Sequence, residues 1–267
     1  MQPFHLLPNH MRTRFWRELP YVGIISNWDK YYIDRSPYAA KIQGQSVLCI
    51  GYSEAEIEQY IEKHNPKDIT VLTNWVGHRD ATVVKYPLLI GDITTETSLP
   101  ADHFGAVLTL SVMEHLSDIE GGLREIKRIL RPNGYLFTLF GPSWSCPYGH
   151  HLYIEGGDPL LDFSVWRLPA YIHLLCSDSE IARFVKDNGL TDDHADMYLK
   201  HFYESPIINR AMYEDYMRLF TDVFQMISSE IMYNTVPADI LADLRVKYAP
   251  YRDFTSYGGS YILKKTF

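Results

Sequence analysis

Two adjacent histidines, His150 and His151, are the side chains in this sequence best suited to move a proton at neutral pH. Histidine titrates near neutrality, so either ring could accept a proton from a substrate hydroxyl group. We predict that this pair is catalytic; the alternative is that one ring packs in its loop and the other faces water. We predict no metal site from the pair with Asp158 or Asp162, because adjacent side chains of extended chain point in opposite directions.

Short apolar runs in the first half of the chain predict the strands of the fold that would position these residues. The run at 46–50 ends at Gly51, and a helical stretch follows it with Ser53 as the predicted N-cap. Five runs are predicted as strands: 46–50, 69–73, 88–92, 104–110 and 135–140. Strands that alternate with helices predict a parallel α/β sheet with right-handed crossovers.

The helix with the clearest pattern lies between the fourth and fifth predicted strands. Ser117 and Glu120 have the spacing of a capping box, and the turn at 132–134 should end the helix. Its apolar residues fall on one face: Ile119, Leu123, Ile126, Ile129 and Leu130. This face is predicted to pack on the sheet.

The second half of the chain departs from this alternation. Proline and aromatic residues are frequent in 143–215, which we interpret as an inserted helical lid whose aromatic side chains roof an acceptor pocket. Beyond the lid, strands at 224–233 and 260–264 should flank a helix at 238–248, with the last strand returning as a hairpin at the sheet edge. The predicted division is an N-terminal helical segment at 1–40, a core at 41–142, the lid at 143–215 and completion of the sheet at 216–267.

Residues Phe104 to Thr138 carry a pattern that resembles the class I S-adenosylmethionine-dependent methyltransferases. The family places a Glu-His pair after its fourth strand, here Glu114 and His115, and then a helix with Arg-Glu-Ile, here at 124–126. A basic-Pro-x-Gly turn follows at 131–134. The resemblance covers about residues 45–142, with weaker support at 216–265. It implies a Rossmann-like, mostly parallel seven-stranded sheet with helices on both faces, and S-adenosyl-L-methionine as the cofactor.

The predicted cofactor loop departs from the family pattern of an acidic residue followed by Gly-x-Gly-x-Gly. Cys49 stands at the position of the acid, and Gly51 is kept, whereas Ser53 and Ala55 replace the next two glycines. Small residues there preserve the close approach of the backbone that glycine provides. The missing acid would have helped to hold the ammonium group of the cofactor, and Glu54 or Asp29 could take its place.

Other strand ends supply further cofactor candidates, because ligands of parallel sheets bind beyond the carboxyl ends of the strands. By the resemblance, Asn74 would bond the ribose hydroxyls, Asp92 would accept from the adenine amino group, and Ile93 and Trp75 would flank the adenine ring. An amide at Asn74 is uncharged, which weakens such a bond. The full predicted cofactor set is Gly51, Tyr52, Ser53, Asn74, Trp75, Asp92, Ile93, Ser111, Glu114 and His115.

Charge and composition narrow the class of partner. The net charge is −8 and the pI is about 5.7, which disfavours a nucleic acid because an acidic protein repels phosphate. No apolar stretch is long enough to span a membrane, and the start of the sequence lacks the apolar core of a signal peptide. Three scattered cysteines suit a reducing compartment. We therefore expect a cytoplasmic protein with a small-molecule acceptor, and a homodimer is left open.

Three functions are compatible with these features to different degrees. The first is S-adenosylmethionine-dependent O-methylation of a small molecule, such as a sugar or a secondary metabolite. The second is a non-catalytic, methyltransferase-like accessory protein with a degenerate cofactor site, which the replaced loop residues favour. A dinucleotide-dependent oxidoreductase is disfavoured, because Glu54 and Glu56 place negative charge where a pyrophosphate would bind.

Overall fold

The computed structural model describes residues 32–74, 85–154, 159–163 and 168–266. Predictions for the chain before residue 32, including Asp29, and for Trp75 and Asp158 lie outside the described residues. The chain divides into two compact units. The sheet unit comprises the described residues of 27–141, 214–231 and 258–267, and the helical unit those of 142–213 and 232–257.

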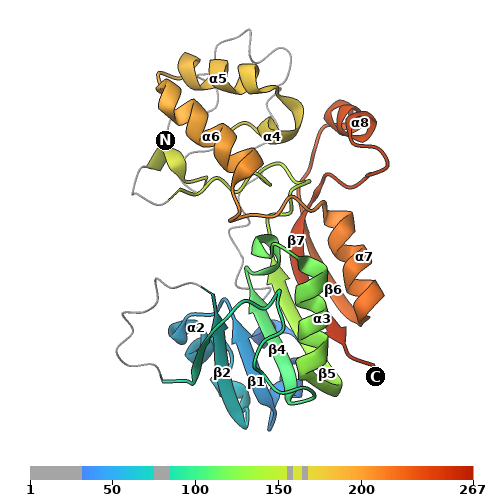
Figure 1. Cartoon of the computed structure of the whole chain (residues 1–267). Helices are drawn as coiled ribbons and strands as arrows, with labels where there is room; N and C mark the ends of the chain where they lie inside the picture. The colour runs from blue at the N-terminus through green and yellow to red at the C-terminus, as the bar shows by residue number, and fades with distance from the viewer. Residues whose placement is uncertain (1–31, 75–84, 155–158, 164–167, 267) are drawn as a thin grey trace. The chain divides into compact units, whose positions relative to one another are not determined.

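The sheet unit is built on seven strands in the order β3-β2-β1-β4-β5-β7-β6 (Figure 1). Neighbours among the first five strands are parallel, whereas β7 runs antiparallel to β5. The predicted seven-stranded α/β sheet is confirmed. The sheet is mixed, because it contains both parallel and antiparallel strand pairs. The strands are β1 (Ser46–Ile50), β2 (Asp68–Thr73), β3 (Leu88–Ile90), β4 (Phe104–Leu110), β5 (Leu130–Phe140), β6 (Gln225–Tyr233) and β7 (Ser256–Lys264).

The position of β7 differs from the predicted hairpin at the sheet edge. It lies between β5 and β6, and its pairing with β5 runs from Tyr135↔Lys264 to Phe140↔Gly259. Nearly every residue of β7 is buried, whereas most of β6 is at least partly exposed. An apolar strand gains by having neighbours on both sides, and a polar strand is better suited to the edge. The edge is therefore β6.

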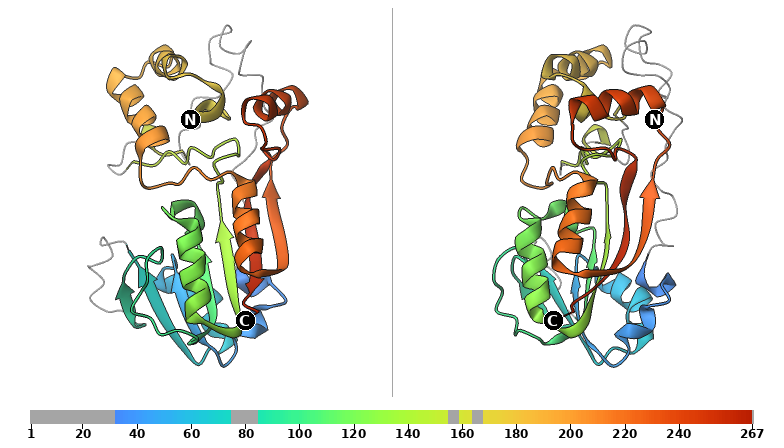
Figure 2. Two further views of the ribbon diagram at one scale, coloured as in Figure 1. Left: turned by 45° about the vertical axis from the view of Figure 1, so that its right-hand side comes forward. Right: turned by 90° about the vertical axis from the view of Figure 1, so that its right-hand side faces the viewer.

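Helices cover both faces of the sheet. Figures 1 and 2 show α2 (Glu54–Tyr60) on the face opposite to α3 (Ile119–Ile129) and α7 (Tyr213–Val223). The predicted N-cap of α3 is wrong by one residue: Asp118, not Ser117, accepts a hydrogen bond from the Gly121 amide at 2.9 Å. A carboxylate there also complements the positive end of the helix dipole.

The helical unit contains α4 (Ile172–Leu175), α5 (Asp178–Asp187), α6 (Asp192–Glu204) and α8 (Ala238–Lys247). These helices share an apolar core with the loop that follows β5. Hydrogen bonds tie α8 to α4, because the Tyr248 hydroxyl and the Lys247 ammonium both donate to the carbonyl of Leu174. Among the described residues, no helix combines the length and apolarity needed to cross a membrane.

Candidate functional site

The carboxyl end of β1 packs tightly against the end of β4 through Gly51. Its φ angle is +79°, a conformation that favours glycine. A Cβ atom at this position would lie 2.2 Å from the carbonyl oxygen of Leu110 and 2.7 Å from Cγ2 of Val112. The residue is nevertheless exposed. The sequence therefore keeps glycine where the turn requires it, and the backbone of the turn remains open on its other side.

The residues after Gly51 begin α2. The Ser53 side chain accepts from the Glu56 amide at 3.3 Å and donates its proton to Glu56 Oε2 at 2.7 Å. Glu56 in turn accepts from the Ser53 amide at 2.8 Å, which completes a capping box. Tyr52 is buried, and burial raises the pKa of its phenol. Ser53 and Ala55 are both exposed at the start of the helix.

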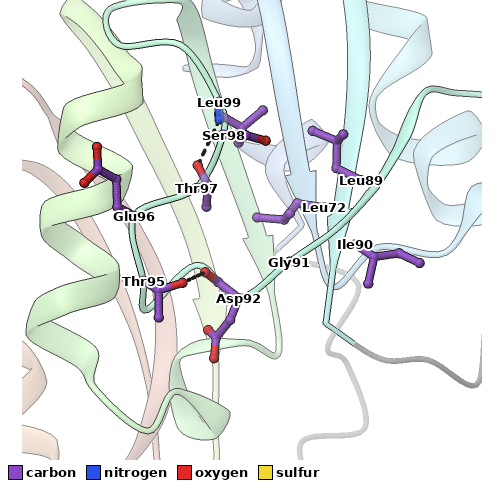
Figure 3. A pocket seen from close by; sticks show the side chains of 10 residues that line it. All are labelled: Leu72, Leu89, Ile90, Gly91, Asp92, Thr95, Glu96, Thr97, Ser98 and Leu99. Atoms are coloured by element: carbon purple, nitrogen blue, oxygen red, sulfur yellow. Dashed lines mark hydrogen bonds between the residues drawn. The ribbon is translucent and has the colours of Figure 1, made fainter.

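The ends of β2 and β3 carry Asn74, Asp92 and Ile93. Asn74 is exposed and Ile93 is buried. Asp92 is half-buried, and its Oδ1 accepts from the Thr94 amide at 2.9 Å. A hollow of about 210 Å³ lies beside it (Figure 3), and in that view the Asp92 carboxylate points away from Leu72. Asp92 is one of the residues that line this hollow.

Two predicted residues follow β4 and differ in exposure. Ser111 is exposed, with a φ angle of +49°, and its amide donates to the Leu139 carbonyl at 2.8 Å. Glu114, on the short 3-10 turn Met113–His115, is only 2% exposed. Its Oε1 accepts from the amide of Gly141 at 3.2 Å, whereas Oε2 has no hydrogen-bond partner among the described residues.

The charge of Glu114 is only weakly compensated. Burial raises the pKa of this carboxyl, and the nearby His115 and two backbone hydrogen bonds oppose the shift in part. His115 itself is half-buried. Because β4 lies between β1 and β5, the structure brings Gly51, Glu114 and the Gly141 amide to adjacent strand ends.

The two predicted catalytic histidines belong to the helical unit. His150 is completely buried, its Nδ1 accepts from the Leu152 amide at 3.1 Å, and its Nε2 has no partner among the described residues. Its ring lies 5.1 Å from that of Phe202, between centroids. His151 is half-buried, with a φ angle of +43°. The two neighbours therefore differ in access to solvent.

Two further histidines that the sequence did not mark as catalytic join His150 in the core of this unit. His173 Nε2 lies 2.8 Å from the Trp144 carbonyl, and His201 Nε2 lies 3.1 Å from the His150 carbonyl. A carbonyl only accepts, so both Nε2 atoms carry a proton. Burial lowers the pKa of His173 to about 4 and shifts those of His150 and His201 in the same direction. All three rings are therefore neutral at pH 7.

Acidic, histidine and cysteine side chains are the groups most able to hold a metal ion. In the part of the chain that the structure describes, no group of three or more such side chains could hold a metal ion. Cys49, Cys146 and Cys176 are all buried and free.

Comparison with known families matches residues 36–138 to the model of a methyltransferase domain. This segment belongs to the class I S-adenosylmethionine-dependent methyltransferases. The family implies S-adenosyl-L-methionine as the cofactor of the methyltransferase domain. A search of curated proteins finds no match.

Solved structures similar to the chain share little sequence with it. A methyltransferase from Methanosarcina mazei is 15% identical, with a TM-score of 0.48 over 86% of this chain and 97% of the other. One from Mesorhizobium loti is 10% identical, with a TM-score of 0.48 over 84% and 92%. A chain from the complex of the Haloferax volcanii Trm112 activator with a methyltransferase is 13% identical, with a TM-score of 0.48 over 90% and 92%.

Two observations indicate that the methyltransferase domain fits this cofactor. The Gly51 turn is kept in a left-handed conformation with its backbone exposed. The buried Oε2 of Glu114 is an unpartnered acceptor among the described residues, at the ends of the central strands. Cys49 supplies no charge, because it is fully buried and burial raises the pKa of its thiol.

Proposed function

We propose that this methyltransferase acts on a small molecule and methylates a hydroxyl oxygen, as on a sugar or a secondary metabolite. The observation that carries the proposal is the Gly51 turn, whose positive φ angle and close approach to the end of β4 support a role as the cofactor loop although Ser53 and Ala55 replace two glycines. The net charge of −8 supports a small acceptor over a nucleic acid. The lid role of 143–215, a homodimer and a cytoplasmic location stay predictions.

The cofactor would be held by residues at the carboxyl edge of the sheet. We propose that Asn74 bonds the ribose hydroxyls and that Asp92 accepts from the adenine amino group. The partial exposure of Asp92 and the exposure of Asn74 support these roles. Ile93 would pack against the adenine ring, and Trp75 is proposed for the other side. The same role in cofactor binding is proposed for Gly51, Tyr52, Ser53, Ser111, Glu114 and His115.

The bound cofactor supplies an electrophilic methyl group on a sulfonium. The protein must then orient the acceptor and remove a hydroxyl proton. We propose that His151 accepts this proton, and its partial exposure supports the role. His150 is proposed to hold the loop, since it is fully buried and its Nδ1 is bonded to the Leu152 amide.

The second candidate function is an accessory protein without catalytic activity. The neutral Cys49 at the acidic position, together with Ser53, Ala55 and Asn74, favours this alternative. Such a protein would bind the cofactor weakly or not at all, and it would act through a partner enzyme.

Calorimetric titration of the purified protein with S-adenosylmethionine and S-adenosylhomocysteine separates the two candidates, with NAD as the control ligand. Micromolar binding of either sulfur ligand, followed by turnover with a hydroxyl acceptor in a screen, is the expected result. Absence of binding would contradict the enzymatic proposal and favour the accessory role.

The proton acceptor is tested by replacing each histidine separately. His151→Ala should reduce kcat about 100-fold or more with saturating acceptor, as expected for loss of a general base. His150→Ala should mainly lower stability, by about 3 kcal/mol, because it empties a buried site. Full turnover of a folded His151→Ala variant would exclude this residue as the base.

A further inference from the structure

The described sheet unit buries two glutamates, and their surroundings are different. Glu125 is 6% exposed, and both of its oxygens are engaged: Oε2 lies 2.7 Å from Arg128 Nε, and Oε1 accepts from the Thr97 amide at 2.9 Å. Burial by itself would raise the pKa of this carboxyl, but the bonds from Arg128 and Thr97 lower it. Glu125 is therefore a fully satisfied structural ion pair.

Glu114 lacks such a set of partners. Glu114 is more deeply buried, at 2% exposure, yet the hydrogen bonds that act on it come from backbone groups, including the Gly141 amide on Oε1. Its Oε2 has no hydrogen-bond partner among the described residues. Burial raises the pKa of this carboxyl, and the neighbouring side chain that opposes this rise in pKa is His115. A buried carboxylate whose hydrogen-bonding capacity is only partly met is costly, so it lowers the stability of the fold that contains it.

Glu114 lies just beyond the end of β4, which is a central strand of the sheet. The 3-10 turn that carries it follows β4, and its hydrogen bond reaches the residue after β5. On the other side of β4 lies β1, whose family position for an acidic residue holds Cys49. Cys49 is fully buried and, as a neutral thiol, contributes no negative charge.

We propose that Glu114 supplies the carboxylate that balances the cationic part of the cofactor, in place of the acid that Cys49 has replaced. The proposal rests on the proposed binding of the cofactor by this domain. It adds that the negative charge opposite the cofactor's cation belongs to Glu114. S-Adenosylmethionine carries an ammonium and a sulfonium group, and S-adenosylhomocysteine keeps the ammonium alone.

Ionisation of Glu114 gives the proposal a measurable signature. Burial disfavours the charged form of Glu114 in the free protein, and a bound cation favours it. Cofactor binding should therefore release a proton from Glu114 wherever the free protein holds this carboxyl protonated. Titration calorimetry in two buffers of different ionisation enthalpy at each pH counts that proton: acetate and MES at about pH 5 to 6, then phosphate and Tris at about pH 7 to 8.

The decisive variant is Glu114→Gln, which keeps an oxygen for the Gly141 amide and removes the charge. We expect its affinity for S-adenosylmethionine to fall at least about tenfold, the scale of one charge-assisted hydrogen bond, and its proton release to disappear. A larger loss for S-adenosylmethionine than for S-adenosylhomocysteine would assign the sulfonium as the partner, and equal losses would assign the ammonium. Either pattern supports the proposal.

Controls separate this role from a structural one. Glu58→Gln changes an exposed glutamate of α2 that has no proposed role in binding, and it should leave affinity and proton release unchanged. Glu114→Asp keeps the charge and should retain the proton release, even where affinity falls. Glu114→Gln with wild-type affinity and wild-type proton release would overturn the role of Glu114 alone. Failure of the wild-type protein to bind either ligand would overturn the proposed function and this inference together.

Discussion

The sheet unit and the helical unit each bury side chains that can carry charge, and burial acts on them with opposite signs. In the sheet unit it raises the pKa of the Glu114 carboxyl, and in the helical unit it lowers the pKa of His150, His173 and His201. Burial favours the neutral form in both cases. The acid and the bases therefore give the two units opposite responses to pH.

The surroundings of these groups differ as well. The histidines are enclosed by rings, with centroids of His150 and His173 only 5.4 Å apart and Trp144 packed 4.5 Å from His173. A neutral imidazole suits such a core, whereas Glu114 stands at strand ends with one oxygen unbonded among the described residues. The comparison indicates that the buried histidines suit the aromatic core around them, whereas the buried glutamate keeps an acceptor oxygen that no described residue satisfies.

The largest expected effect is loss of stability of the helical unit in acid. The pKa of His173 is about 4 when folded and 6.5 when unfolded, so the unfolded chain binds a proton over this window and the folded chain does not. Stability is therefore lost as the pH falls from 6.5 towards 4, by about 3 kcal/mol from His173. Hydrogen exchange resolved by segment, corrected for intrinsic rates, should show α5 and α6 losing protection.

The matched variant is His173→Gln, which cannot take up this proton. Its protection should depend less on pH over the same window, although its stability at pH 7 falls because a packed ring is lost. Equal pH dependence in the variant and the wild-type protein would show that the buried histidine has no part in the response.

An effect of intermediate size is expected from Glu114 in the cofactor-free protein. The resulting dependence of stability on pH is opposite in sign to that from His173. Because its folded pKa is raised, the folded state holds the proton longer, and stability is lost as the pH rises through that pKa. Glu114→Gln should therefore stabilise the cofactor-free protein by about 1 kcal/mol at pH 8, and by less at pH 5. Urea unfolding at the two pH values measures the difference.

Glu125→Gln provides the contrast within the same unit. It removes the carboxylate that pairs with Arg128, so it should destabilise the protein at both pH values. If Glu114→Gln behaved in the same way, the Glu114 carboxylate would be a structural ion partner and the distinction between the two glutamates would fail.

The smallest effects are expected at two serines that cap helices in the different units. Ser53 caps α2, and Ser177 stands before α5 with its amide and hydroxyl both donating to Glu180 Oε2 at 2.9 Å. Each Ser→Ala change should cost about 0.5 kcal/mol in thermal or urea unfolding, the lower end of the range for loss of an exposed cap. Only Ser53→Ala should also weaken cofactor binding; unchanged binding would limit Ser53 to the cap.

Local patterns were sufficient to predict much of the sheet. The apolar runs at 46–50 and 104–110 are β1 and β4 with the predicted bounds, since a buried strand needs a continuous apolar stretch. The sequence predicts that β5 starts at Tyr135, because Pro132 and Gly134 indicate a turn. It begins at Leu130 instead, which pairs with Phe104 ahead of a register shift in β4.

The sequence by itself determined the elements, the Gly51 turn and the family, because periodicity, caps and small residues act over a few positions. Only the tertiary structure decided which ionisable groups are buried and what they bond. Glu114 meets an amide 27 residues away, and His201 meets a carbonyl 51 residues away. Burial and hydrogen bonding arise from packing between distant segments, and these set the charge of Glu114 and of the histidines.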